Sequence, residues 1–207
     1  MDIEIKRLAP DMAEEYAAFF DETPHYDGVP EQTCYCVTWR DDETYKGDDH
    51  WYEPRGERRR RAVEFVRGGH IRGYLAYRGG KAVGWMNATG KCRGGVSYLR
   101  GFWPIPEDDP SERVFSAMCF MIAEGARHTG VATALLRRAC EDAAAEGYDV
   151  VEGYTEEKPF DPAHDFRGSI GMYEKLGFIK IAETGGKAVM RLKLADWKND
   201  QSKGGRA

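Results

Sequence analysis

The run RVFSAMCFMIA, residues 113–123, limits what this chain can fold into more than any other segment. It is apolar at nearly every position rather than at every second one, which is the pattern of a strand covered on both faces of a sheet. The period then changes, because Val131, Leu135 and Ala139 recur at the spacing of one helix face. A doubly covered strand that leads through a short turn into an amphipathic helix predicts an α/β fold with helices on both faces of the sheet.

The spacing of apolar residues predicts the other strands and helices, and turn residues such as glycine and proline mark where they end. Strands are expected at residues 2–8, 73–78, 81–89, 148–151, 178–183 and 187–194, and helices at residues 10–20, 56–67, 131–146 and 166–176. Their order contains no repeat and predicts a mixed sheet in one domain, residues 1–197, followed by a polar tail, residues 198–207. Residues 21–54 are too long and too irregular for a plain connection, so we expect them to form a functional segment.

Composition argues against several classes of protein. The chain is 42% hydrophobic and has a formal net charge of −5, whereas a nucleic-acid-binding protein normally carries a dominant basic face. Its only dense basic run, Arg58–Arg61, is interpreted as solvated surface. No apolar run is long enough to span a bilayer, and the acidic start of the chain does not have the pattern of a secretory signal. Five cysteines, an odd number, predict reduced thiols in a cytoplasmic protein.

Cys34 and Cys36 raise the question of a metal site. A C-x-C pair without a second pair of Cys or His nearby is a weak zinc motif, so no metal is predicted and both side chains are expected to pack as small apolar groups. The surrounding segment is rich in aromatic residues. These residues either line a ligand pocket or form a small core of their own, and the sequence leaves both interpretations open.

The turn between the apolar run and the following helix has the composition of an anion site. It reads Arg127-His128-Thr129-Gly130-Val131-Ala132. The first N–H groups of a helix have no intrahelical acceptor and carry partial positive charge. Gly130 and Ala132 keep the surface low enough for a pyrophosphate to approach the backbone, and Arg127 adds a permanent cation. Two rival phosphate-binding motifs, G-x-x-x-x-G-K-[ST] and G-x-G-x-x-G, are absent from the chain.

A second motif follows this turn at the distance of one helix, one strand and a loop. Residues 169–178 read SIGMYEKLGF, so Tyr173, Gly177 and Phe178 fit the pattern Y-x-x-x-G-F. The preceding turn fits the pattern [RQ]-x-x-G-x-[GA]. In this order the two motifs resemble the GNAT superfamily of acetyl-CoA-dependent N-acetyltransferases, and the resemblance covers roughly residues 114–194. Either motif alone is weak, whereas the pair is specific.

The resemblance implies both a fold and a reaction. The fold is a single domain with a mixed, mostly antiparallel sheet that is splayed between its fourth and fifth strands. The reaction uses acetyl-CoA as co-substrate, and an amine attacks it directly in a ternary complex without a metal. The residues implied for acetyl-CoA are Met121 and Ile122 along the pantetheine arm, and Arg127, His128, Thr129, Gly130, Val131, Ala132 and Thr133 around the pyrophosphate.

The catalytic residues are also implied by the resemblance. Tyr173 matches the family's general acid, and its phenol, with an ordinary pKa near 10, would protonate the departing sulfur or donate a hydrogen bond to it. The alternative for Tyr173 is an interior side chain that packs one face of its helix. Glu152 is the candidate base and would act on the amine through water; the alternative is a solvated carboxylate at a strand end. Glu124 is a second candidate base, close enough to the turn to be structural.

The chain departs from the family pattern in two places. Phe166 stands where many members carry Asn, so the CoA contact of that amide must be absent or replaced by Ser169. Residues 155–165 form a longer connection than usual, which would reshape the mouth of the substrate site. The acceptor, an amine of a small molecule or peptide, is expected against residues 21–54 and the loops around Trp103 and Phe160.

Two other functions stay open from the sequence. The chain could bind acyl-CoA as a sensor or scaffold without turnover, or it could be an unrelated phosphate-binding α/β domain in which both motif matches are accidental. No nucleic-acid or membrane partner is expected. The sequence does not determine the identity of the acceptor, and it leaves the oligomeric state open, a homodimer included.

Overall fold

The structure, a computed structural model, describes residues 2–23, 29–39, 53–90, 96, 99–107, 109–158, 161 and 165–197. A seven-stranded sheet with the order β1-β2-β3-β4-β5-β7-β6 forms its centre. The strands are β1 (Glu4–Arg7), β2 (Gly73–Arg78), β3 (Lys81–Gly90), β4 (Val114–Ile122), β5 (Val150–Glu156), β6 (Ile179–Thr184) and β7 (Lys187–Lys193). Neighbouring strands are antiparallel except β4 and β5, which are parallel. The prediction of a mixed, mostly antiparallel sheet is confirmed.

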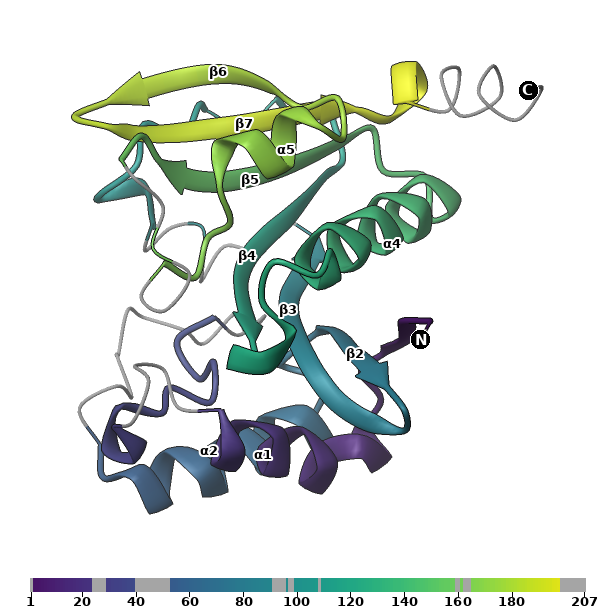
Figure 1. Ribbon diagram of the computed structural model, residues 1–207. Helices are drawn as coiled ribbons and strands as arrows, with labels where there is room; N and C mark the ends of the chain where they lie inside the picture. Colours follow the sequence, from purple (N-terminus) through teal and green to yellow (C-terminus); the bar gives the residue numbers. More distant parts are fainter. Residues whose placement is uncertain are drawn as a thin grey trace.

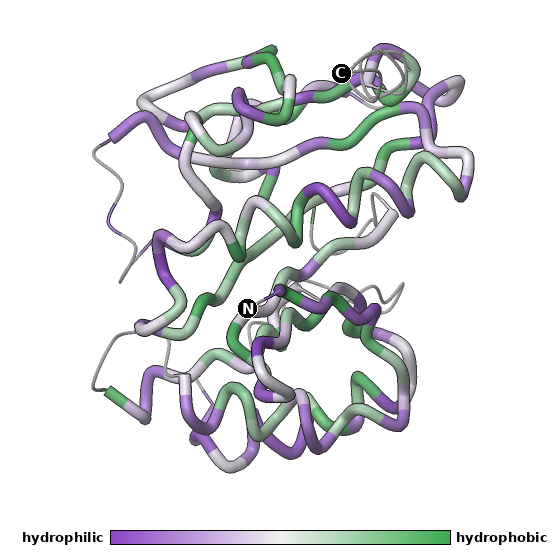
Figure 2. Tube along the Cα trace, turned by 45° about the vertical axis from the view of Figure 1, so that its right-hand side comes forward, coloured by the Kyte–Doolittle hydropathy of each residue, from purple (hydrophilic) through white to green (hydrophobic). Residues whose placement is uncertain are grey.

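Helices cover both faces of this sheet, with α1 and α2 side by side on one face and α4 and α5 on the other (Figure 1). The helices are α1 (Ala13–Glu22), α2 (Arg55–Arg67), α4 (Val131–Ala145) and α5 (Ile170–Glu174). Short 3₁₀ turns are η1 (Pro10–Met12), η2 (Pro30–Gln32) and η4 (Glu124–Ala126). Along α4, hydrophobic and hydrophilic residues alternate at helical spacing (Figure 2), as the sequence pattern predicts.

The apolar run of β4 supplies both hydrophobic cores. Phe115, Ala117 and Phe120 belong to the core between the sheet and α4 and α5. Met118 and Met121 belong to the core between the sheet and α1 and α2. None of these five side chains is more than 4% exposed. The prediction of a strand covered on both faces is confirmed, and the reason is that β4 lies in the middle of the sheet order.

β4 loses its partner β5 halfway along its length, whereas its pairing with β3 continues to Ile122. Ala117 and Cys119 pair with consecutive residues of β3, so Met118 between them has no partner there and forms a β-bulge. The parallel ladder with β5 covers four residue pairs and ends at Ala117 and Gly153, although both strands continue beyond it. Because a bulge bends its strand, the end of β4 turns away from β5 (Figure 1).

Residues 165–169, which we call the bridging segment, connect β4 and β5 where their ladder has ended. The Phe120 N–H group of β4 donates to the Phe166 carbonyl at 2.5 Å. On the other side, the Thr155 hydroxyl of β5 donates to the Gly168 carbonyl at 2.5 Å. The predicted helix over residues 166–176 is therefore wrong in its first part, because this main chain bonds to the two strands and helix α5 begins only at Ile170.

Two other sequence interpretations need correction. β5 extends to Glu156 instead of stopping at residue 151, because β7 pairs with it along its whole length. In the basic run that was interpreted as solvated surface, Arg58 is only 5% exposed. Its guanidinium donates to the main-chain carbonyls of Thr33, at 2.9 Å, and of Glu31 and Glu53. Arg58 therefore ties α2 to the segment that precedes it.

Several sequence predictions fall outside the described residues. These are the tail, residues 198–207, much of the segment of residues 21–54, and the position of Phe160. Cys34 and Cys36 are described and are free thiols, of which Cys36 is buried. Within the described ranges, His, Cys, Asp and Glu side chains form no group of three or more able to hold a metal ion. No helix in that same part of the chain is long and apolar enough to cross a membrane.

Candidate functional site

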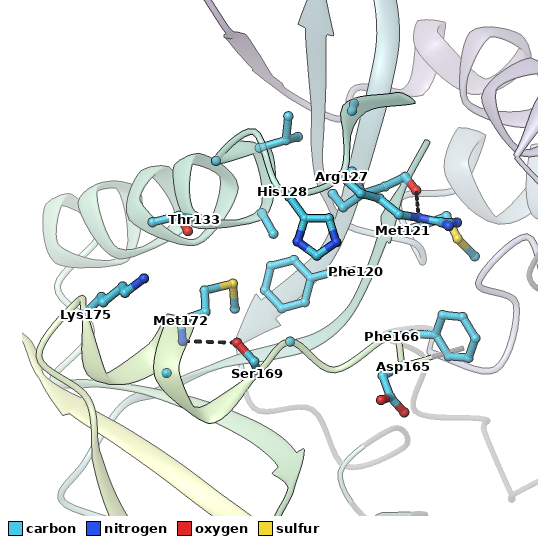
Figure 3. Close-up of a pocket in the computed structure, with 17 residues that line it drawn as sticks. Phe120, Met121, Arg127, His128, Thr133, Asp165, Phe166, Ser169, Met172 and Lys175 are labelled. Carbon is cyan, nitrogen blue, oxygen red and sulfur yellow. Dashed lines mark hydrogen bonds between the residues drawn. The ribbon is translucent and has the colours of Figure 1, made fainter. Parts of the chain in front are cut away.

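A pocket of about 470 Å³ opens between the end of β4, the turn before α4 and the beginning of α5 (Figure 3). Most of the residues implied for acetyl-CoA line it, namely Met121, Ile122, Arg127, His128, Gly130, Val131, Ala132, Thr133 and Ser169. Thr129, Tyr173 and Glu152 do not. Tertiary folding thus brings two motifs that are far apart in the sequence to opposite walls of one pocket.

The main chain at the start of α4 forms one wall. Gly130 precedes the helix with φ at 86°, a left-handed conformation that favours glycine. The first intrahelical hydrogen bond runs from the Ala134 N–H group to the Gly130 carbonyl at 2.9 Å. The N–H groups of the preceding three helical residues therefore have no acceptor within the helix. A Cβ atom at Gly130 would meet nothing within 4 Å, so an anion can approach these N–H groups.

Side chains of the turn shape the same wall. The Arg127 Nε atom donates to the Ile122 carbonyl at 3.3 Å, which keeps the cation beside the end of β4. His128 has φ at 58° and points its imidazole into the pocket (Figure 3). Thr129 points elsewhere, because its hydroxyl donates to the Ala126 carbonyl at 2.7 Å and accepts from Arg78 at 2.9 Å. Thr129 therefore closes the turn and does not line the pocket.

The edge of β4 that faces the bridging segment is only partly available to a ligand. Its Phe120 N–H group and Met118 carbonyl are already bonded to that segment. Alternate residues of a strand direct their main-chain groups to the same side. The groups of Ile122 therefore face the pocket side, whereas those of Met121 face β3, where Met121 pairs with Trp85. Of the two residues implied for the pantetheine arm, only Ile122 therefore directs its main-chain groups toward the pocket.

The opposite wall comes from the beginning of α5. Ser169 caps this helix by accepting from the Met172 N–H group at 3.2 Å, and it lines the pocket as well. Lys175 lies across the pocket from the start of α4 (Figure 3) and adds a second cation to the pocket lining. We did not predict Lys175 from the sequence. Its spacing of three from Met172 and four from Gly171, which both line the pocket, places it on the same helix face.

Tyr173 is fully buried behind the pocket wall. Its hydroxyl donates to the Arg167 carbonyl at 2.9 Å. A Cβ atom at Gly168, which lines the pocket, would lie 3.4 Å from its ring, so only a glycine separates Tyr173 from the pocket. The same ring covers Gly153, where the ladder between β4 and β5 ends. Burial raises the pKa of Tyr173, so the phenol is protonated at neutral pH.

Glu152 lies in the middle of β5 and is fully buried, so the interpretation as a solvated strand-end carboxylate is wrong. The Arg191 Nε atom donates to one carboxylate oxygen at 3.1 Å, and the Tyr154 hydroxyl donates to the other at 3.0 Å. A buried carboxylate needs such partners because removing it from water without them is costly. Glu124, the second candidate base, is exposed at the start of η4 and does not line the pocket.

The pocket therefore suits an elongated ligand with an anionic end. Free N–H groups at the start of α4 can hold phosphate oxygens, and Arg127 and Lys175 add two cations to the pocket lining. Phe120, Met121 and Met172 provide an apolar lining for a less polar arm. The arm would end beside Gly168, which places a reacting group next to Tyr173. The residues present fit coenzyme A in charge and in polarity.

Comparison with known proteins agrees with this arrangement. The sequence profile described as the Acetyltransferase (GNAT) family matches residues 10–178. A search of the curated proteins finds no match.

Solved structures share the fold at low sequence identity. The acetyltransferase of GNAT family from Streptococcus pneumoniae is 17% identical, with a TM-score of 0.52 over 93% of this chain and 99% of that one. The PaiA N-acetyltransferase from Thermoplasma acidophilum, solved in complex with coenzyme A, is 16% identical, with a TM-score of 0.52 over 93% and 99% of the two chains. At such identity the likeness shows the fold alone.

Proposed function

This chain belongs to the GNAT family of acetyltransferases, and on that premise we propose that it transfers the acetyl group of acetyl-CoA to an amine of a small molecule or peptide. The observation that carries this proposal is the open start of α4, where Gly130 leaves main-chain N–H groups accessible beside Arg127. The Thermoplasma acidophilum structure contains coenzyme A, which supports the same ligand here.

The ligand contacts follow from the pocket walls. The pyrophosphate binds the N–H groups from His128 to Thr133, with Arg127 and Lys175 as cations. The pantetheine arm runs along the main chain of Ile122, past Met121 and Ser169. The thioester then lies beside Gly168, at the end of the ladder between β4 and β5.

The reaction is a direct attack by the neutral amine on the thioester carbonyl. A C–N bond forms, the C–S bond breaks, the nitrogen loses one proton and the departing sulfur gains one. Tyr173 supplies a proton or a hydrogen bond to that sulfur, because its phenol is protonated and lies behind Gly168. We leave Glu152 out of the proton path, because Arg191 and Tyr154 hold its two oxygens and it does not line the pocket.

The acceptor reaches the thioester from the face of the sheet that carries α1 and α2. Residues 21–54 contribute Trp39 to this face, which supports their expected role on the acceptor side. Residues 1–197 then act as one acetyltransferase domain. Buried free thiols such as Cys36 and Cys119 support a reducing compartment, the cytoplasm.

Thiol release from acetyl-CoA across a panel of amines tests the proposal. We expect turnover in the wild type, and in Tyr173→Phe a kcat lower by about 100-fold, the low end of what a general acid contributes. Tyr16→Phe is a matched control, because the Tyr16 phenol is also buried and also donates to a main-chain carbonyl, that of Tyr35, at 2.8 Å. Both variants lose one buried hydrogen bond, but only the first should lose kcat.

The outcomes separate the candidate functions. Saturable CoA binding without turnover on any amine would support a sensor or scaffold. A chain that does not bind CoA at all would contradict both that function and acetyl transfer. An equal fall of kcat in the two tyrosine variants would show that Tyr173 acts only by packing.

A further inference from the structure

A second cavity, of about 180 Å³, adjoins the cofactor pocket at the bridging segment. Three residues of this segment, Asp165, Phe166 and Gly168, line both spaces. The remaining residues of the second cavity are Thr155, Glu156, Lys158 and Arg167. The bridging segment therefore borders both spaces, and a molecule in the second cavity would lie next to the place proposed for the thioester.

Arg167 lines only the second of these two cavities, and its guanidinium lies against two tryptophans. Its guanidinium carbon is 4.9 Å from the ring centroid of Trp39 and 4.3 Å from that of Trp103. Trp103 is itself anchored to β5, because its indole N–H group donates to the Thr155 carbonyl at 3.1 Å. A guanidinium that stacks on aromatic rings can still donate hydrogen bonds from its edge.

The edge of this guanidinium is mostly unused. Its Nη1 atom donates to the Met118 carbonyl at 3.2 Å. In the part of the chain that the structure describes, no carboxylate lies within ion-pair distance of it. The two carboxylates in the cavity wall already share another cation, because the Lys158 ammonium lies 3.1 Å from Glu156 and 2.8 Å from Asp165.

A guanidinium in these surroundings favours an anionic ligand. Burial lowers the pKa of Arg167, which means that its charged form is poorly solvated. An anion that bonds to the remaining N–H groups would compensate for that loss of hydration. The planar edge of a guanidinium matches the two oxygens of a carboxylate. The cavity is also smaller than the roughly 300–1,000 Å³ of pockets for drug-sized ligands, so it fits a small molecule.

We infer that the acceptor is a small amine that also carries a carboxylate, such as an amino acid, and that Arg167 binds this carboxylate. The inference rests on the proposed function, because it places the acceptor of that reaction. With the carboxylate on Arg167, the amine lies toward Asp165 and Gly168, the residues that line both spaces, which is the direction of the thioester. Arg167 is then a specificity-determining residue of the acetyl transfer.

Matched pairs of acceptors test the inference in the wild type. Thiol release is measured with the standard amino acids and with their carboxamides, which keep the amine and lose the carboxylate charge. The best amino acid should exceed its carboxamide by about 100-fold in kcat/KM, as expected when one partner of a desolvated charge pair is removed. Equal or faster turnover of the carboxamides would contradict the inference and leave acetyl transfer intact. Turnover of amines without a carboxylate, and of no amino acid, would do the same. No turnover of any amine would overturn both.

Variants then assign the effect to Arg167. Arg167→Gln should raise the KM of the amino acid and lower its kcat/KM by about 100-fold, with less than a threefold change for the carboxamide. A residue that only supports the fold would lower both alike. Arg113→Gln is the matched control, because Arg113 also stacks on an aromatic ring, at 4.6 Å from Tyr148, and donates to the main-chain carbonyls of Glu146 and Gly147. It should leave both acceptors unchanged.

Discussion

The two sides of the bridging segment are built from different parts of the chain. On the proposed cofactor side, the groups offered to a ligand are main-chain groups of consecutive residues, and the side chains there are small, as at Gly130 and Ala132. On the proposed acceptor side, the groups are side chains from distant segments, with Trp39 and Trp103 both against Arg167. A site made of main chain depends on local conformation, whereas a site made of side chains depends on how the elements pack.

The difference predicts which property, ligand binding or stability, a substitution on each side affects. On the cofactor side, a substitution that fills the space over the main chain should remove ligand binding and leave the fold intact. On the acceptor side, a substitution that breaks a buried side-chain pair should weaken the fold and leave CoA binding intact.

Gly130→Glu should have the largest effect, because its side chain would bring negative charge to the pyrophosphate site. We expect CoA affinity to fall by about 1,000-fold, or about 4 kcal/mol, measured by isothermal titration calorimetry. Gly69→Glu is the control, because Gly69 has φ at 73°, close to the 86° of Gly130, and equally open surroundings after the end of α2. Both variants carry the same charge and similar backbone strain. Unchanged affinity in Gly130→Glu would show that the turn is not the phosphate site.

Arg191→Met should have the next largest effect and tests a buried charge pair that, like Arg167, depends on packing between distant elements. It leaves Glu152 buried without its cation, which should lower the free energy of unfolding by about 3 kcal/mol, measured by urea denaturation. Arg60→Met removes an exposed arginine that also pairs with two carboxylates, and it should leave the free energy of unfolding nearly unchanged because solvent screens such pairs. CoA affinity should stay the same in both variants. Full stability of Arg191→Met would mean that Glu152 does not need a counter-ion.

Ser169→Ala should have the smallest effect and lies where the two sides meet. Loss of the N-cap of α5 should cost about 1 kcal/mol in the free energy of unfolding. If Ser169 also contacts CoA, the affinity should fall by a few fold, about 1 kcal/mol for a single hydrogen bond. Ser111→Ala is the control for an exposed serine hydroxyl, which bonds only to Asp109. An unchanged CoA affinity in Ser169→Ala would limit the residue to capping.

The predictions from sequence were accurate where a pattern is local. The doubly covered run of β4 and the apolar face of α4 both follow from side-chain spacing, and the structure has both of them. They were wrong where long-range bonds decide the conformation. Residues 166–169 have an acceptable helix pattern, but Phe166 and Gly168 bond to strands on either side instead.

The sequence by itself determined the candidate phosphate site at the start of α4, which consists of main-chain groups. Gly130 and the residues around it adopt their conformation through local sterics, and the free N–H groups at the start of α4 follow from the helix geometry alone. Only the tertiary structure decided how the buried charges are paired. Glu152 is buried beside Arg191 because β5 and β7 are neighbours, and Arg167 lies against two tryptophans because three distant segments meet there. The physical reason is that burial and pairing of a charge depend on contacts between elements, which no short stretch of sequence contains.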